Sequence, residues 1–105
     1  MPFLVTMTED AERQFLALAV RDQRILQGAI GSRLFHEPTK ESRSIKRLRP
    51  NSIAEFELRI GDLRVMYAVD SANQEVIIGV VGEKRGNKLF VEGREYHDHK
   101  SDQPE

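Results

Sequence analysis

The sequence has 105 residues, the length of one domain with a modest hydrophobic core. Hydrophobic residues make up 39% and charged residues 31%, a balance typical of a globular chain rather than a disordered one. The absence of cysteine excludes disulfides, thiolate nucleophiles and cysteine-based zinc sites, and it agrees with a reducing compartment. Sixteen Lys and Arg stand against 17 Asp and Glu. The formal net charge of −1 excludes a strongly basic domain, so any contact with nucleic acid must come from a local patch.

No apolar run approaches the roughly 20 residues that a membrane-spanning helix needs. The first residues also lack the charged and then apolar layout of a signal peptide. The sequence therefore predicts a single domain over residues 1–105, located in the cytoplasm and without a membrane partner. Residues from about 93 to 105 are strongly polar and are expected to form a loose tail.

The first third of the chain predicts one strand followed by a helical hairpin. Residues 3–7 are apolar and rich in strand formers. Thr8, followed by two acidic residues, is typical of a helix start, and helical spacing predicts a helix over residues 8–20. A second helix is predicted from about residue 22 to residue 34, before Pro38. The apolar positions are Ala11, Phe15 and Leu18 in the first helix and Leu26, Ala29, Ile30 and Leu34 in the second.

Two alternating stretches in the second half predict a β-hairpin. Residues 37–51 are polar and predict only a connection. Apolar and polar residues then alternate over residues 55–60 and again over residues 64–69. Between them, Gly61 and Asp62 suit the two-residue turns that match the twist of the strands. This turn places Ile60 opposite Leu63, Arg59 opposite Arg64 and Leu58 opposite Val65.

Two further strands are predicted, over residues 76–82 and 88–92. If Val69 pairs near Val76, these strands form an antiparallel meander whose apolar face the helices must cover. That face is predicted to hold Phe56, Leu58, Val65, Tyr67, Val69, Ile78 and Val80. The opposite face is predicted to hold Glu55, Glu57, Arg59, Arg64, Met66, Gly79, Val81 and Glu83.

The predicted register puts two arginines, Arg59 and Arg64, directly opposite each other. Like charges in such positions destabilise a sheet, so this pair needs an anionic partner. Glu57, diagonal to Arg64, can supply it within the chain, and a bound anion is the alternative. Recognition of an anion by this pair requires both guanidinium groups to lie adjacent on the uncovered face.

Three segments carry a resemblance to a known family: KRLRPN at 46–51, EFELRIGDLRVMY at 55–67 and VGEKRGNKL at 81–89. With them the chain resembles the RelE/ParE toxin superfamily, and most of all a branch that ends in a segment like GREY at 93–96. The resemblance covers nearly the whole chain. It implies an α+β fold with an N-terminal strand, a two-helix hairpin and an antiparallel β-meander, the helices being packed on one face of the sheet.

The resemblance also implies the toxin component of a type II toxin-antitoxin pair. A cognate antitoxin protein would wrap the toxin in a hetero-oligomer and cover its working surface. In the RelE branch the toxin cleaves mRNA in the ribosomal decoding site and stops translation, whereas in the ParE branch it inhibits DNA gyrase without cleaving RNA. A degenerate toxin that binds only its antitoxin is the third alternative, and the fold does not choose among the three.

RNA cleavage of the RelE kind is an attack of the ribose 2′-OH on the adjacent phosphate, which requires no metal and no cofactor. Arginine suits the stabilisation of the charged transition state, because its planar fork binds phosphate oxygens in pairs. By the resemblance, Arg64 matches the hairpin arginine of RelE, and Arg85 matches a second basic residue after the last core strand. The residues expected to bind the RNA are Arg47, Arg49, Arg59, Lys84 and Lys88.

Glu55 and Glu57 stand where RelE carries lysines, so its lysine-based proton transfer cannot be carried over. Other RNases of the superfamily use a carboxylate and a histidine, which makes Glu57 a candidate base and His97 or Tyr96 a candidate acid. The alternative is that Glu57 is an ordinary salt-bridge partner of a neighbouring arginine. His97 and His99 lie in the polar tail without an evident third ligand, so no metal site is predicted.

Overall fold

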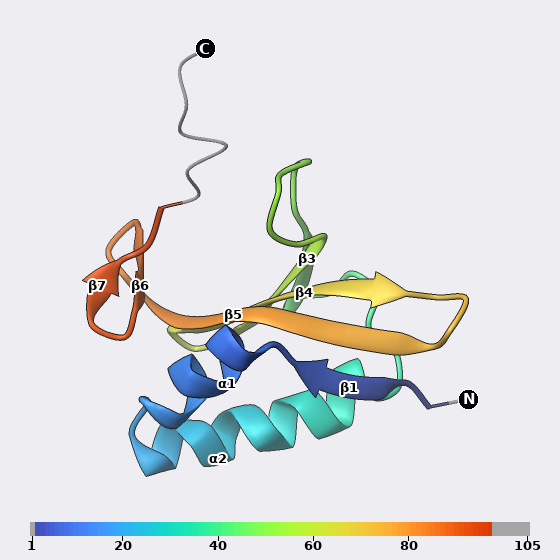
Figure 1. The fold of residues 1–105 in the computed structure, drawn as a ribbon, viewed down its shortest axis with the longest axis horizontal. Helices are drawn as coiled ribbons and strands as arrows, with labels where there is room; N and C mark the ends of the chain where they lie inside the picture. Colours follow the sequence, from blue (N-terminus) through green and yellow to red (C-terminus); the bar gives the residue numbers. More distant parts are fainter. Residues whose placement is uncertain (1, 98–105) are drawn as a thin grey trace.

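Two helices cover one face of a mainly antiparallel sheet in the computed structural model, which describes residues 2–97 (Figure 1). Within this range the strands form one seven-stranded sheet in the order β2-β3-β4-β5-β6-β7, with β1 added beside β5. No helix of the described residues has the length and apolar character needed to cross a membrane. The predicted α+β fold is confirmed. Its elements are β1 (Leu4–Met7), α1 (Glu9–Leu16), α2 (Val20–Ala29), the π-helical turn η1 (Ile30–Leu34), β2 (Ile45–Arg47), β3 (Phe56–Ile60), β4 (Leu63–Asp70), β5 (Glu75–Arg85), β6 (Lys88–Val91) and β7 (Arg94–Glu95).

Local hydrogen bonds set the ends of the helices. Thr8 caps α1, because its side-chain oxygen accepts a hydrogen bond from the amide of Ala11 at 3.1 Å. The predicted helix over residues 8–20 ends earlier, at Leu16, since the side chain of Gln23 donates to the carbonyl oxygens of Leu16 and Leu18 and holds the connection between the helices. The helical side of the core consists of Ala11, Phe15, Leu26, Ala29 and Leu34, all of them predicted core positions.

The predicted hairpin is confirmed in its register, with Arg59 opposite Arg64 and a turn at residues 61–62. The prediction that residues 37–51 contain no strand is wrong at β2, which pairs antiparallel with β3. β2 has three residues, of which only Ile45 is buried. It is an edge strand with charged side chains, so it has neither the length nor the alternation that predicts a strand.

A β-bulge in β5 changes the register of the sheet halfway along the strand. At one end Val69 lies opposite Val76, as predicted. The pairing then shifts by one residue, so that Gly79 has no partner on β4. Because side chains alternate between the two faces of a strand, every residue of β5 after the bulge lies on the face opposite to the one predicted.

The predicted faces are therefore wrong for Val80, Val81 and Glu83. Val81 lies opposite Val65 and joins the core, where 1% of its surface is exposed. Val80 lies on the side of the sheet away from the helices. Glu83 moves to the helix side. The sequence could not show this shift, because Val80, which was predicted for the core, and Val81, which takes that place, are the same type of residue.

The second edge of β5 is covered in three parts. β1 pairs in parallel with residues 75–78, and β6 pairs with residues 83–85. Between them the side chain of Gln14, which is 7% exposed, accepts a hydrogen bond from the amide of Val81 at 2.9 Å. A glutamine side chain from α1 thus satisfies a backbone group that no strand reaches.

We expect Gln14→Leu to lower the free energy of unfolding by about 1–3 kcal/mol, because the buried amide of Val81 loses its acceptor. Leucine preserves most of the side-chain volume, so the substitution tests the hydrogen bond more than the packing. Gln27→Leu, on the exposed surface of α2, is the matched control and should change the stability by less than about 0.5 kcal/mol. Urea unfolding followed by circular dichroism measures both, and equal stabilities of the two variants would contradict the assignment.

Tyr67 joins the sheet to the segment that follows the helices. Its side chain is fully buried and stacks on the ring of Phe56, with the ring centres 5.5 Å apart. Its hydroxyl group donates a hydrogen bond to the carbonyl oxygen of Pro38 at 2.6 Å. Burial raises the pKa of the Tyr67 hydroxyl well above its ordinary value of about 10. The position confirms the prediction that Tyr67 belongs to the core.

Tyr67→Phe should lower the free energy of unfolding by about 1–2 kcal/mol at neutral pH, because the carbonyl group of Pro38 loses its donor. Above pH 10 or so the tyrosine of the unfolded chain ionises while the buried one stays neutral, which stabilises the unfolded state. The stability advantage of the wild type over Tyr67→Phe should therefore be constant below this pH and shrink above it. Unfolding curves at a series of pH values test this, and a difference that grows in alkali would refute it.

Candidate functional site

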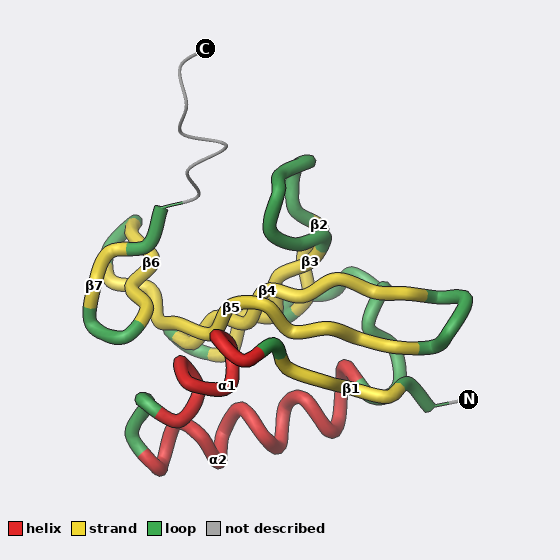
Figure 2. Tube along the Cα trace, in the orientation of Figure 1, coloured by secondary structure: helices red, strands yellow, loops and turns green. Residues whose placement is uncertain are grey.

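The face of the sheet away from the helices is the candidate site, and we call it the open face. The loop over residues 48–55 and the described residues after β7, 96–97, lie on this side, at opposite ends of the sheet (Figure 2). Strand pairing and alternation place four cationic side chains and one carboxylate on the part of this face nearest the turn at residues 61–62, although the whole chain has a net charge of −1. At the other end of β4 and β5, Asp70 and Glu75 lie on the same face. The cationic part of the open face consists of Lys46, Glu57, Arg59, Arg64, Met66, Val80, Gly82 and Lys84.

Glu57 and Arg59 form an ion pair along β3. The Nε atom of Arg59 donates to Oε1 of Glu57 at 2.8 Å, and the side chain of Glu57 is only 10% exposed. The prediction of Glu57 as a salt-bridge partner of a neighbouring arginine is confirmed. The second carboxylate oxygen, Oε2, has no hydrogen bond to any residue between 2 and 97.

Arg64 points along β4 toward the turn rather than toward Arg59. Its Nη1 atom donates to the carbonyl oxygen of Gly61 at 2.7 Å and to that of Leu63 at 2.9 Å. The two arginines share the open face, but each guanidinium group is bound separately within the chain, so the expected anion site between them is not formed. The Nε atom of Arg64 is buried and has no hydrogen-bond partner, which leaves this cation incompletely satisfied.

Gly82 lets β6 pass close over the open face beside Arg64. It is the residue of β5 that lies opposite Arg64. A Cβ atom at this position would lie 2.5 Å from the carbonyl oxygen of Phe90, so only glycine lets β6 approach β5 this closely. Two residues further along the strand, Lys84 returns to the same face, and its amide donates to the carbonyl oxygen of Asp62 in the hairpin turn.

Arg85 lies on the other side of the sheet from Arg64. The pairing and alternation of β5 put it on the helix side, where its guanidinium group lies 4.7 Å from the centre of the Phe90 ring. Its second neighbour there is the carboxylate of Glu83, at 3.7 Å. The structure does not bring the two predicted catalytic arginines together, and Lys84 is the basic residue of this segment that shares the open face with Arg64.

The remaining predicted RNA-binding residues are dispersed. Arg47 stacks on the buried ring of Phe56, 4.7 Å from its centre, and so belongs to the helix side of the edge strand. Arg49 is exposed in the loop over residues 48–55. The Nζ atom of Lys88 lies 3.7 Å from the carboxylate of Glu95, at the opposite end of the sheet.

The candidate acids lie on the segment after β7. His97 is half exposed, and its Nε2 atom lies 3.6 Å from a carboxylate oxygen of Glu95. The amide of Tyr96 donates to the carbonyl oxygen of Leu89, which keeps this segment beside β6. His99 lies outside the described residues. The other glutamate of the predicted site, Glu55, accepts a hydrogen bond from a backbone amide of β4 at 2.9 Å and closes the edge of the hairpin.

One cation of the open face was not among the predicted site residues. Lys46 lies opposite Glu57 across the β2–β3 pairing and therefore shares its face. Within the basic run at residues 46–49, only the pairing of β2 decides which side chain faces which side. The local sequence carries no signal for it.

The sheet with its covering helices and its cationic open face has the architecture of a RelE/ParE-type toxin. Comparisons with protein-family models and with curated proteins give no match. Among solved structures, the chain is similar to one in the toxin-antitoxin complex RelBE2 from Mycobacterium tuberculosis, with 30% identity and a TM-score of 0.67 over 79% of this chain and 92% of that one. It is similar in fold to the archaeal RelE-RelB complex from Pyrococcus horikoshii OT3, with 20% identity and a TM-score of 0.66 over 82% of this chain and 98% of that one. The chain belongs to the RelE toxin family.

Proposed function

We propose that the chain is the toxin of a toxin-antitoxin pair and acts in the cytoplasm as a ribosome-dependent mRNA endonuclease that inhibits translation. Membership of the RelE family supports the toxin role, and both similar structures are complexes of a toxin with its antitoxin. An antitoxin protein that binds this chain in a hetero-oligomer and covers the open face would keep it inactive.

The observation that carries the RNase proposal is the concentration of cations on the part of the open face nearest the turn at residues 61–62, in a chain with a net charge of −1. Lys46, Arg59, Arg64 and Lys84 come from four successive strands, and only Arg59 is neutralised by a carboxylate there. Contacts to the phosphate backbone give most of the affinity of proteins for nucleic acid and need no base recognition. A local patch of this kind suits an RNA strand that the ribosome already holds in place.

Arg64 and Lys84 are the groups we propose for the transition state. In RNA cleavage the 2′-OH attacks the adjacent phosphorus, the bond to the 5′ oxygen breaks, and negative charge accumulates on the phosphate oxygens. In its present position Arg64 has two hydrogen bonds, both from Nη1 to carbonyl oxygens, and its Nε atom has none. If the guanidinium group turns to a phosphate, it gives up these two hydrogen bonds and forms a bidentate pair that includes Nε. We assign to Lys84 the role that was predicted for Arg85, because Lys84 lies on the same face as Arg64.

Glu57 is the group we propose for removal of the 2′-OH proton. Its ion pair with Arg59 uses Oε1 and leaves Oε2 without a partner within residues 2–97. His97 or Tyr96, on the segment after β7, would return a proton to the leaving oxygen.

Arg64→Gln should abolish growth arrest when the chain is expressed alone and should reduce mRNA cleavage about 100-fold or more, because it removes the principal cation of the site. Arg24→Gln, which makes the same change in charge at an exposed position of α2, should remain as toxic as the wild type. Mapping of mRNA 5′ ends after induction measures the cleavage. Full activity of Arg64→Gln would remove the open face from the mechanism.

Glu57→Gln should reduce RNA cleavage by about 10²- to 10⁴-fold, as expected for the loss of a general base, and should leave the fold unchanged. Glutamine keeps the size of the side chain and a hydrogen-bond acceptor for Arg59. The purified variant is compared with the wild type on translating ribosomes, with circular dichroism as the test of folding. Undiminished cleavage would make Glu57 a structural ion-pair partner only.

A second candidate function is the inhibition of DNA gyrase without catalysis. It is favoured by one observation, that Glu55, Glu57 and Arg59 are all engaged in bonds within the sheet while Arg85 lies on its other face. The same induction experiment separates the two candidates. A change in plasmid supercoiling with intact mRNA supports gyrase inhibition, whereas new mRNA 5′ ends support the nuclease.

A further inference from the structure

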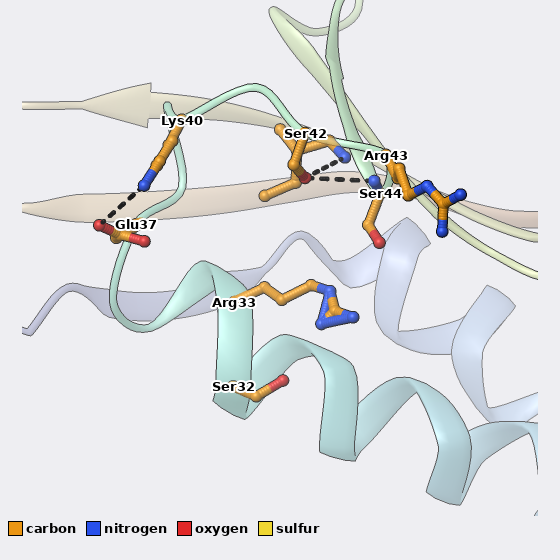
Figure 3. Close-up of a pocket in the computed structure, with 8 residues that line it drawn as sticks. Ser32, Arg33, Glu37, Lys40, Ser42, Arg43 and Ser44 are labelled. Carbon is orange, nitrogen blue, oxygen red and sulfur yellow. Dashed lines mark hydrogen bonds and ion pairs between the residues drawn. The ribbon is translucent and has the colours of Figure 1, made fainter.

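A pocket of about 470 Å³ lies on the helix side of the molecule, between η1 and the segment over residues 37–45 that leads into β2 (Figure 3). It is separate from the open face, since η1 belongs to the helical layer. The proposed nuclease and gyrase functions use none of its residues.

The pocket is rich in positive charge. Its lining contains three cations, Arg33, Lys40 and Arg43, and one carboxylate, Glu37. The carboxylate lies 4.0 Å from the Nζ atom of Lys40, so these two charges offset each other. Neither guanidinium group forms a hydrogen bond or an ion pair with any residue between 2 and 97. The pocket therefore holds two arginines whose charge nothing in the described chain neutralises.

The two arginines come from separate elements and face the same space. Arg33, which is half buried, reaches from η1 toward the segment that carries Arg43 and Ser44 (Figure 3). The carbonyl oxygen of Arg33, at the end of η1, accepts a hydrogen bond from the amide of Glu37 at 2.9 Å. This oxygen is therefore not a free hydrogen-bond acceptor in the pocket. Two like charges that share a cavity repel each other, and an anion between them removes the repulsion.

Serine hydroxyl groups add neutral donors to the same wall. Ser42 accepts hydrogen bonds from the amides of Ser44 and Ile45, which fixes the loop and leaves its hydroxyl proton available. Ser44 lines the pocket as well, and its hydroxyl has no partner within the described residues. Guanidinium forks combined with hydroxyl donors match the tetrahedral oxygens of a phosphate group.

We propose that this pocket binds a phosphate group, with Arg33 and Arg43 on its oxygens and the hydroxyl of Ser44 as an additional donor. An isolated phosphate and a phosphodiester of a nucleic-acid backbone share this chemistry. The site does not depend on the proposed nuclease function, because it lies on the helix side.

The test is a titration of the purified full chain, at constant ionic strength, with inorganic phosphate and separately with a short single-stranded RNA without terminal phosphates. Amide chemical shifts of residues 32–33 and 42–45 report the binding. We expect saturable shifts confined to these residues with at least one of the two ligands. Saturation by inorganic phosphate alone identifies an isolated phosphate as the ligand, and saturation by the RNA identifies the backbone phosphodiester.

The double variant Arg33→Gln/Arg43→Gln should weaken this binding at least tenfold, and Arg43→Gln alone, in the exposed segment, should weaken it to an intermediate degree. The matched control is Arg21→Gln/Arg24→Gln, which removes the same charge from exposed positions of α2 outside the pocket. Repeating the titration in the Arg64→Gln background separates this site from the open face. Absence of saturable shifts with both ligands, or equal affinities of the double variant and the control, would overturn the proposal.

Discussion

The way β5 is held in the sheet decides which of its basic side chains shares a face with Arg64. β5 pairs with β4 along one edge, while β1, the side chain of Gln14 and β6 cover the other edge in succession. The bulge at Gly79 adds one residue between the two halves of the strand. This shift turns Val81 into the core, and with it the rest of β5 reverses its faces. As a result Lys84 shares the open face with Arg64, and Arg85 lies on the helix side of the sheet.

The hydrogen bond that the backbone amide of Val81 donates to the side chain of Gln14 links the helical layer to β5. The amide at that point belongs to a stretch that neither β1 nor β6 reaches, so without the glutamine a buried donor would be unsatisfied. The same stretch leads directly to Gly82, over which β6 passes at a distance that excludes any side chain. A helix residue on one face thus stabilises the strand geometry that shapes the other face.

The sequence predicts the hairpin well because two local rules agree there. A two-residue turn at Gly61 determines which residues pair, and the alternation on both sides assigns the faces, so the position of Arg64 follows without further information. The rest of the site depends on non-local contacts. The face of Lys46 is decided by a three-residue edge strand, and that of Arg85 by a bulge among similar valines, and neither leaves a periodic signal in the sequence.

The open face also shows how a chain with more acidic than basic residues can present a cationic surface. The glutamates nearest to the site are used inside the sheet: Glu57 binds Arg59, and Glu55 binds a backbone amide of β4. Arg64 is left with two carbonyl oxygens on Nη1 and a buried Nε atom without an acceptor, an arrangement that costs stability. Buried polar groups that lack a hydrogen-bond partner occur mostly at functional sites. Nε is reached by a phosphate oxygen only after the guanidinium group turns out of this buried position, as we propose, and the incomplete bonding of Arg64 in its present position supports that proposal.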